Sequence, residues 1–147
     1  MHFQCKPFQE LTITELYAIL QVRTDVFVVE QACPYPEVDG KDQQCLHMFL
    51  EIEGDIAAYC RLLPPGISYE QTSIGRVLVH PAHRGKGLAQ QMMKLAINTI
   101  EKEMNETTIK IQAQAYLQAF YEQLGFLVVS DTYLEDNIPH IDMVRTV

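Results

Sequence analysis

A glycine-rich turn in the middle of the chain carries the residue types that bind a phosphate group. It opens an apolar-periodic segment, residues 87–103, which predicts a helix. The first turn of a helix has free backbone N–H groups and the positive end of the dipole, and small residues let an anion approach them. The turn consists of Arg84, Gly85, Lys86, Gly87, Leu88 and Ala89. It predicts a pyrophosphate site, and a glycine-rich turn without a ligand remains the alternative for this segment alone.

Two other phosphate motifs do not fit this turn. A P-loop needs GxxxxGK followed by Ser or Thr, but His80 stands at the first glycine and Gly87 follows Lys86. A dinucleotide fingerprint, GxGxxG, fails at Gln90. The chain has 19 acidic and 11 basic side chains, a formal charge of −8, and no basic stripe. Nucleic acid is therefore not expected as a partner, and an anionic ligand must be bound by local donors.

The elements around the turn predict a mixed α/β fold. Residues 73–79 read as a strand that Pro81 closes, and it leads into the turn. Residues 108–115 alternate between apolar and polar side chains, which predicts a further strand. Residues 24–31 fit either a helix or a strand, and residues 33–40 read as a loop. The remaining strands are expected at 2–8, 46–53, 55–62, 126–130 and 140–146, and the other helices at 12–22 and 116–124.

Three local patterns predict the ends and the buried face of the helices. Thr12 and Glu15 form a capping box at the start of the first helix. Gly125 is placed to cap the C-terminus of the last one. The residues expected on the buried face of the long helix are Leu88, Met92, Leu95, Ala96 and Ile100.

Two segments resemble the signature motifs of the GNAT family of N-acetyltransferases. Arg84, Gly87 and Ala89 match the Q/R-x-x-G-x-G/A pattern of the family's motif A. Residues 120–126, FYEQLGF, resemble motif B, a helix that ends in Y-x-x-x-G-F, and the two motifs have the right order and separation. Further segments resemble the ElaA-like branch of the family: 26–31, 33–35, 39–40, 61–64, 74–77 and 138–141.

This resemblance implies a fold and a cofactor. The expected fold is α/β, with a mixed, mostly antiparallel central sheet that is flanked by helices and splayed between the strands at 73–79 and 108–115. Acetyl-coenzyme A would lie in the splay, with its pyrophosphate on the glycine-rich turn and its pantetheine arm on backbone groups of Val77 and Val79. Gln114 stands where family members often carry an asparagine. The residues expected at the cofactor are Val77, Leu78, Val79, Arg84, Gly85, Lys86, Gly87, Leu88, Ala89, Gln114 and Phe120.

The expected reaction moves an acetyl group from the thioester to an amine. It needs a base for the amine, N–H donors for the carbonyl oxygen and an acid for the leaving thiolate. The resemblance implies that Tyr121 is the acid, and a core aromatic in an apolar helix stripe is the alternative. Many relatives carry a base on the central strand, but residues 73–79 contain no carboxylate.

His140 is therefore one candidate for the base. Histidine is the side chain whose ordinary pKa suits proton uptake near neutrality. The segment 138–143, IPHIDM, also resembles a Pro-His-Ile-x-Met segment of glyphosate N-acetyltransferase, whose histidine acts as base. A solvent-exposed histidine is the alternative, and His47 and Glu30 are weaker candidates.

Arg23 and Arg76 suggest what the amine carries. Both roughly match arginines that bind acidic groups in glyphosate N-acetyltransferase, and a guanidinium binds a carboxylate through two parallel hydrogen bonds. The substrate is thus expected to be a small-molecule primary or secondary amine that also carries an acid. For Arg76, a structural arginine paired with Asp or Glu is the alternative.

Composition bounds the organisation of the protein. The length fits a single GNAT domain over residues 1–147. No signal peptide or 18-residue apolar stretch is found, so the chain is expected in the cytoplasm and not in a membrane, while a homodimer is left open. The four cysteines form no CxxC pair, which argues against a metal site.

Two loop features have simple interpretations, and one competing function remains. Glu37, Asp39 and Asp42 are interpreted as solvated loop carboxylates, and Cys33 is not expected to be a nucleophile. The competing function is an acyl-coenzyme A sensor or partner module that has the same fold without the chemistry.

Overall fold

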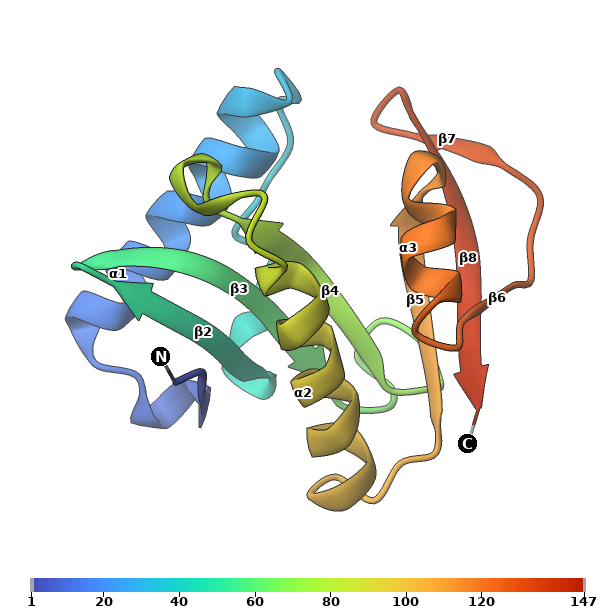
Figure 1. The fold of residues 1–147 in the computed structure, drawn as a ribbon, viewed down its shortest axis with the longest axis horizontal. Coiled ribbons are helices and arrows are strands. Elements are labelled where there is room, and N and C mark those ends of the chain that lie inside the picture. Colours follow the sequence, from blue (N-terminus) through green and yellow to red (C-terminus); the bar gives the residue numbers. More distant parts are fainter. Residues whose placement is uncertain (1, 147) are drawn as a thin grey trace.

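Two antiparallel sheets lie side by side and define the architecture of the chain (Figure 1). The computed structural model describes residues 2–146. The strand order is β1-β2-β3-β4 in the first sheet and β5-β8-β6 in the second, with β7 paired to β8. The first sheet contains β1 (Gln4–Pro7), β2 (Leu46–Ile52), β3 (Asp55–Leu63) and β4 (Ser73–Val79). The second sheet contains β5 (Thr108–Gln114), β6 (Leu127–Val128), β7 (Tyr133–Glu135) and β8 (Ile138–Thr146).

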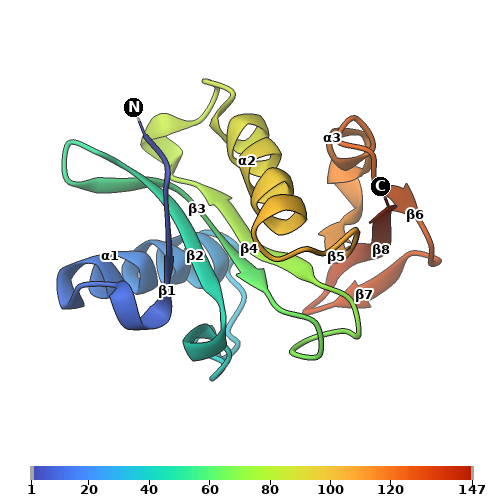
Figure 2. The same cartoon turned by 90° about the horizontal axis from the view of Figure 1, so that it is seen from below.

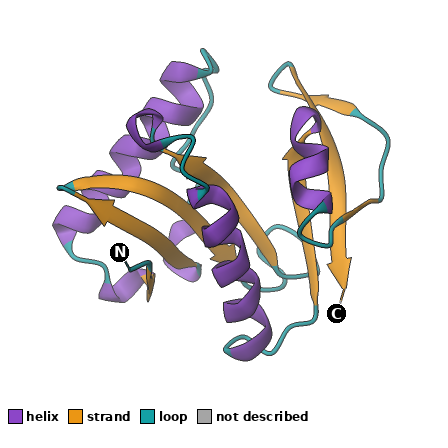
Figure 3. Ribbon diagram, viewed as in Figure 1, coloured by secondary structure: helices purple, strands orange, loops and turns teal. Residues whose placement is uncertain are grey.

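Helices cover both faces of the first sheet (Figures 2 and 3). On one face, Ile19 and Val22 pack against a core that includes Leu78 of β4. On the other face, Met92 and Ala96 belong to the larger core, which also receives side chains from the second sheet. The helices are α1 (Ile13–Arg23), α2 (Leu88–Lys102) and α3 (Gln118–Glu122), with a 3₁₀ turn at Ala115–Leu117 before α3.

The two sheets separate between β4 and β5. Within residues 2–146, the backbone pairing between them is a single parallel bridge, in which the N–H of Lys110 donates to Thr72 O at 2.9 Å. Beyond this bridge the two strands diverge (Figure 1). The prediction of a mostly antiparallel α/β fold that splays between these two strands is confirmed.

A local sequence signal accounts for the start of α1. The Thr12 side chain accepts from the Glu15 N–H at 3.0 Å and the Glu15 carboxylate accepts from the Thr12 N–H at 2.9 Å, so the capping box is confirmed. The ambiguous segment after α1 forms a π-helix, Thr24–Glu30. On α2 the buried stripe is centred on Met92 and Ala96, and the prediction for Leu95 is wrong because it lies at the solvent edge, 44% exposed.

A β-bulge interrupts β4 at the position where the sheets separate. Tyr59 of β3 lies opposite Leu78, but Arg61 lies opposite Gly75, so Arg76 and Val77 both face one residue of β3. Arg76 has a φ of 52°, in the left-handed region that side chains rarely adopt. Because of the extra residue, the side chains on the two halves of β4 alternate between the faces of the sheet out of phase.

The C-terminal part contains one strand that the sequence did not predict. β7 is three residues long and forms a hairpin with β8 through a turn at Asp136 and Asn137, whose φ values are 52° and 62°. β6 is shorter than the predicted strand 126–130. Within the described residues, no helix combines the length and apolar character that a membrane crossing requires.

Candidate functional site

A cavity of about 850 Å³ lies in the splay between β4 and β5. Residues 73–79 of β4 and 112–114 of β5 line it from the two sheets. The π-helix and the loop after it, the start of the segment that carries α3, and the β7–β8 hairpin supply the other walls. The volume is within the range of sites that bind cofactors and drug-sized ligands.

The glycine turn, defined here as Arg84 to Gly87, joins the edge of this cavity to the N-terminus of α2. Gly85 and Gly87 have φ values of 83° and 74°, which favour glycine regardless of any ligand. A Cβ at either position would meet no atom within 4 Å, so the space over the turn is open. Gly87 is the N-cap of α2, and no side chain among residues 2–146 caps this helix start, so its first-turn N–H groups lack an intrahelical or side-chain acceptor.

The two cations of the turn differ in what they contact. Arg84 donates from both terminal nitrogens to the Glu30 carboxylate, at 2.6 and 2.8 Å, and from Nε to Val79 O at 2.9 Å. The Arg84 side chain therefore joins the turn to the π-helix. Lys86 is exposed and forms no ion pair with a described residue, so it is the cation of the turn that is free to meet an anion.

The residues expected at the cofactor divide between the cavity and its rim. Val77, Leu78, Val79, Arg84 and Gln114 line the cavity, whereas the segment from Gly85 to Ala89 lies beyond its lining. The Leu78 and Leu88 side chains are buried in the two cores, so each could contact a cofactor only through its backbone. Phe120 is not part of the lining and packs edge-on against Tyr121, with ring centroids 5.1 Å apart.

Tyr121 lies at the wall of the cavity on α3. It is 6% exposed and its ring packs edge-on against Phe126 as well as Phe120. Burial raises the pKa of the Tyr121 phenol well above its usual range. The hydroxyl therefore stays protonated at neutral pH.

His140 lies on β8, directly opposite Gln114 of β5, and lines the same cavity. Its Nδ1 is 2.7 Å from Ile138 O. Because a carbonyl only accepts, Nδ1 carries the hydrogen, and in the neutral ring Nε2 is left as the acceptor. The ring also stacks on Tyr133, with centroids 6.4 Å apart. This arrangement fixes the tautomer that a base requires.

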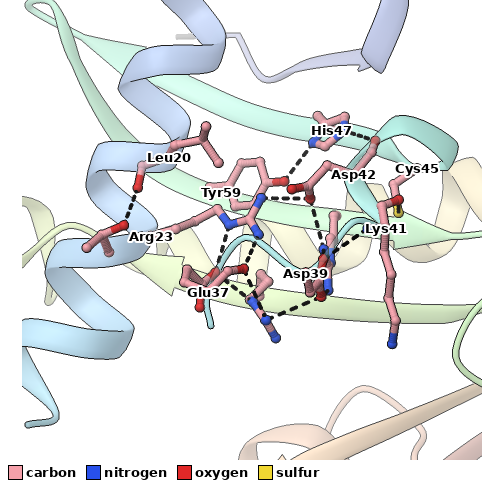
Figure 4. Close-up of polar contacts among 12 residues, drawn as sticks. Leu20, Arg23, Glu37, Asp39, Lys41, Asp42, Cys45, His47 and Tyr59 are labelled. Atoms are coloured by element: carbon pink, nitrogen blue, oxygen red, sulfur yellow. Dashed lines mark hydrogen bonds and ion pairs between the residues drawn. The ribbon is translucent and has the colours of Figure 1, made fainter. Parts of the chain in front are cut away.

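An ionic cluster (Figure 4) contributes Asp39, Arg61 and Arg76 to the lining of the cavity. It consists of Arg23, Arg61, Arg76, Glu37, Asp39 and Asp42. Three guanidinium groups thus meet three carboxylates, with Glu37, Asp39 and Asp42 each contacting two arginines. The interpretation of these carboxylates as solvated loop groups is wrong, since Glu37 and Asp42 are each 5% exposed.

The structure corrects the predicted role of Arg23. Its side chain is 0% exposed and donates to Glu37 Oε2 and Asp42 Oδ1, both at 2.8 Å, and to Glu37 O at 3.1 Å. It therefore cannot bind a substrate acid directly, because every donor group is inside the protein and already paired.

Arg76 is paired with carboxylates and is also partly exposed to the cavity. Its Nε donates to Glu37 Oε2 at 2.7 Å and its Nη2 lies 3.4 Å from Asp39 Oδ2, as the alternative of a structural arginine predicted. The side chain is nevertheless 21% exposed and lines the cavity. A substrate acid at Arg76 would have to share it with two carboxylates.

Arg61 was missed at the sequence level. It donates to both oxygens of Asp39 and, through Nη1, to Asp42 Oδ1 at 2.8 Å. The signal was a charge within the apolar run of β3, since a buried arginine requires carboxylate partners. Hydrogen bonds from arginines outweigh burial and hold the pKa values of Asp39 and Asp42 below their usual range.

The weaker candidates have other roles. His47 is wholly buried between the Tyr59 hydroxyl and Asp42 O, at 2.7 and 2.8 Å, and burial lowers its pKa, so it cannot meet a substrate. The Glu30 carboxylate is occupied by Arg84, and that hydrogen bond lowers its pKa. The Cys33 thiol is buried and its pKa is raised by burial. Among residues 2–146, no three His, Cys, Asp or Glu side chains gather in a way that could bind a metal.

Comparisons with known proteins agree with this geometry. A family model described as an acetyltransferase (GNAT) domain matches residues 19–147. A UPF0039 protein of Schizosaccharomyces pombe is 42% identical over 145 residues, which cover 97% of this chain and 95% of its own. Protein ElaA of Escherichia coli is 41% identical over 140 residues, covering 94% and 92% of the two chains.

Two crystal structures superpose closely on the whole chain. An acyl-CoA N-acyltransferase from Pseudomonas aeruginosa gives a TM-score of 0.93 at 45% identity, covering 99% of this chain and 100% of its own. Escherichia coli ElaA gives a TM-score of 0.92 at 40% identity, covering 99% of both chains.

Proposed function

This chain belongs to the GNAT acetyltransferase family, in its ElaA-like branch, and from that premise we propose that it transfers the acetyl group of acetyl-coenzyme A to a small-molecule amine. One observation carries the proposal. The glycine turn joins the cavity to an uncapped helix N-terminus, with open space over two left-handed glycines and a free lysine beside them. These are the donors that a pyrophosphate needs in a chain of formal charge −8.

The residues of the chain divide the work of binding. The N–H groups of Leu88 and Ala89, with Lys86, would meet the pyrophosphate, while backbone groups of Val77 and Val79 would hold the pantetheine arm. The bulge supports this role of β4, because it interrupts the pairing of the strand with β3 beside the cavity. Acetyl-coenzyme A supplies the acetyl group as a thioester.

The proton transfers are assigned to the two side chains that line the cavity with suitable chemistry. His140 Nε2 would take a proton from the amine, directly or through water, as the amine nitrogen bonds to the carbonyl carbon and the C–S bond breaks. Tyr121 would then donate its hydroxyl proton to the thiolate. Transfer is direct, in a complex that contains both substrates, because none of the described side chains at the cavity is an activated nucleophile: burial raises the pKa of Cys33.

The description of the Pseudomonas aeruginosa relative as an acyl-CoA N-acyltransferase supports the same class of reaction. Acetyl as the acyl group, and a primary or secondary amine as acceptor, belong to the proposal. The single domain over residues 1–147, the homodimer and the cytoplasmic location stay predictions.

Calorimetry with acetyl-coenzyme A tests the cofactor site. Gly87→Glu puts a carboxylate over the turn, where it repels a pyrophosphate, and we expect at least a ~100-fold loss of affinity, about 2.7 kcal/mol. Gly87→Ala is the matched control: it shares the positive φ without the charge, and it meets no atom within 4 Å. Equal affinity of wild type and Gly87→Glu would refute the site.

Thiol release with a panel of amines tests the chemistry. Tyr121→Phe should bind acetyl-coenzyme A normally. Its rate constant for acetyl transfer, measured in single-turnover experiments, should fall by about 10²–10⁴-fold. His140→Asn should lower the rate and remove the lower limb of its pH profile. Tight binding by a wild type that releases no thiol with any amine would instead support the sensor function.

A further inference from the structure

Four Lys or Arg side chains line the cavity, and three of them are already neutralised by carboxylates. Arg61 and Arg76 belong to the ionic cluster, in which three cations meet three carboxylates. Arg84 is bound by both oxygens of Glu30. The fourth is Lys41, whose Nζ has no carboxylate within 4.0 Å among residues 2–146.

Lys41 is held in place while its ammonium group stays open to the cavity. Its backbone N–H donates to Asp39 Oδ1 at 3.1 Å, which ties the lysine to the ionic cluster. The side chain extends away from that cluster (Figure 4). Its Nζ donates to Ser68 Oγ at 2.9 Å, a neutral partner that leaves the positive charge uncompensated.

The surroundings of Lys41 are better suited to bind a carboxylate than the surroundings of the cavity arginines. Since the cluster is balanced, it does not neutralise Lys41, and Lys110 Nζ adds a second cation 4.8 Å from the centroid of the Tyr69 ring. Ser68 and Tyr69 line the cavity beside it, and both carry hydroxyl groups that can donate. Glu135 and Asp136 also line the cavity, and a carboxylate would be repelled by these two anions.

We propose that Lys41 Nζ, together with the Ser68 hydroxyl, binds a carboxylate carried by the amine substrate. This assignment rests on the proposed acetyl transfer and replaces Arg23 and Arg76 as the anchor of the acid. It defines the substrate class as an amine that also carries a carboxylate.

A series of linear ω-amino acids, each compared with its own amide, tests the anchor. Wild type should prefer the acid over the amide for at least one chain length in the series from glycine to 11-aminoundecanoate. Lys41→Gln should lower kcat/KM for that acid about tenfold or more, mainly through KM, and leave its amide unchanged. Lys41→Arg should retain the preference. Lys94→Gln is the control, because Lys94 is exposed on α2 and does not line the cavity. An equal loss for acid and amide, or no preference in wild type, would overturn the proposal.

A binding measurement separates this proposal from the transfer reaction. The product analogues from N-acetylglycine to 11-acetamidoundecanoate are titrated into protein saturated with coenzyme A, and their amides are titrated in parallel. For at least one chain length the acid should bind about tenfold more tightly than the amide to wild type, and Lys41→Gln should remove the difference. This result needs no turnover, so an inactive protein that shows it would refute acetyl transfer and keep the anchor. Equal binding of acid and amide to wild type would refute the anchor.

Discussion

The glycine turn and the ionic cluster both border the same cavity and are built in opposite ways. The turn is exposed, presents backbone N–H groups that no described side chain caps, and leaves open space over Gly85 and Gly87. The cluster is buried, uses side chains, and pairs each carboxylate with two arginines. In the proposed function the turn receives a charged ligand, while the cluster has paired its own charges and supports the wall and the loop that carries Lys41.

This difference in burial determines how much free energy of unfolding is lost when a charged side chain is removed from each region. An exposed ion pair contributes about 0–1 kcal/mol, because water screens it. Removing one partner from a buried pair leaves an uncompensated charge and costs about 3–5 kcal/mol. The cluster should therefore govern stability, and the turn should govern ligand affinity.

Truncation of Arg23 tests the larger of these effects. Arg23→Met keeps much of the side-chain volume but leaves Glu37 and Asp42 with one arginine each, so we expect a loss of about 3–5 kcal/mol in the free energy of unfolding. Urea denaturation measures it. Arg84→Met is the comparison, because its pair with Glu30 is 43% and 42% exposed, and it should cost less than about 1 kcal/mol. Equal losses in the two variants would end the distinction between the regions.

Acid titration of the folded protein gives a smaller effect. The arginines hold the pKa values of Asp39 and Asp42 below their usual range, so both carboxylates bind protons more readily in the unfolded chain. Their stabilisation is fully present above the unfolded pKa of about 3.9 and is lost as pH falls through the folded values. The free energy of unfolding in urea should decline below about pH 4. A flat profile between pH 5 and 3 would contradict this account of the cluster.

Removal of the Glu30 charge should give the smallest of these effects. It should change the ligand affinity of the turn and leave the stability of the protein almost unchanged. Glu30→Gln frees the Arg84 guanidinium for a phosphate and removes an anion beside it. We expect about a two- to threefold gain in acetyl-coenzyme A affinity at low salt, with stability changed by less than about 0.5 kcal/mol. Glu103→Gln removes the same charge at the far end of α2 and should leave affinity unchanged. A loss of affinity in Glu30→Gln would mean that the pair positions the turn for its ligand.

Most of the fold followed from patterns that are local in the sequence. The capping box at Thr12, the strand 73–79 and the glycine turn each depend on residues within a few positions of one another. Local patterns failed where the structure depends on partners. β7 has three residues and exists through its pairing with β8, and the π-helix after α1 has no periodicity of its own.

The sequence predicted part of the site and missed the part that depends on distant partners. Val77, Val79, Arg84, Gln114, Tyr121 and His140 come together around one cavity. The ionic cluster could not be predicted, because Glu37 is 14 residues from Arg23 and 39 from Arg76. Carboxylates in a loop rich in proline look solvated until the arginines of distant strands and helices are placed beside them.

The bulge in β4 determines which face of the sheet each side chain of the strand occupies. Ile74 and Leu78 are four residues apart, an even spacing that would put both side chains on one face of a regular strand. Instead Ile74 joins the core under α2 and Leu78 joins the core under α1. Loss of one residue at Arg76 would restore the regular alternation and turn every side chain on one half of the strand to the wrong core. No substitution within β4 has that effect, so the two-faced core depends on the number of residues in this strand as much as on their identity.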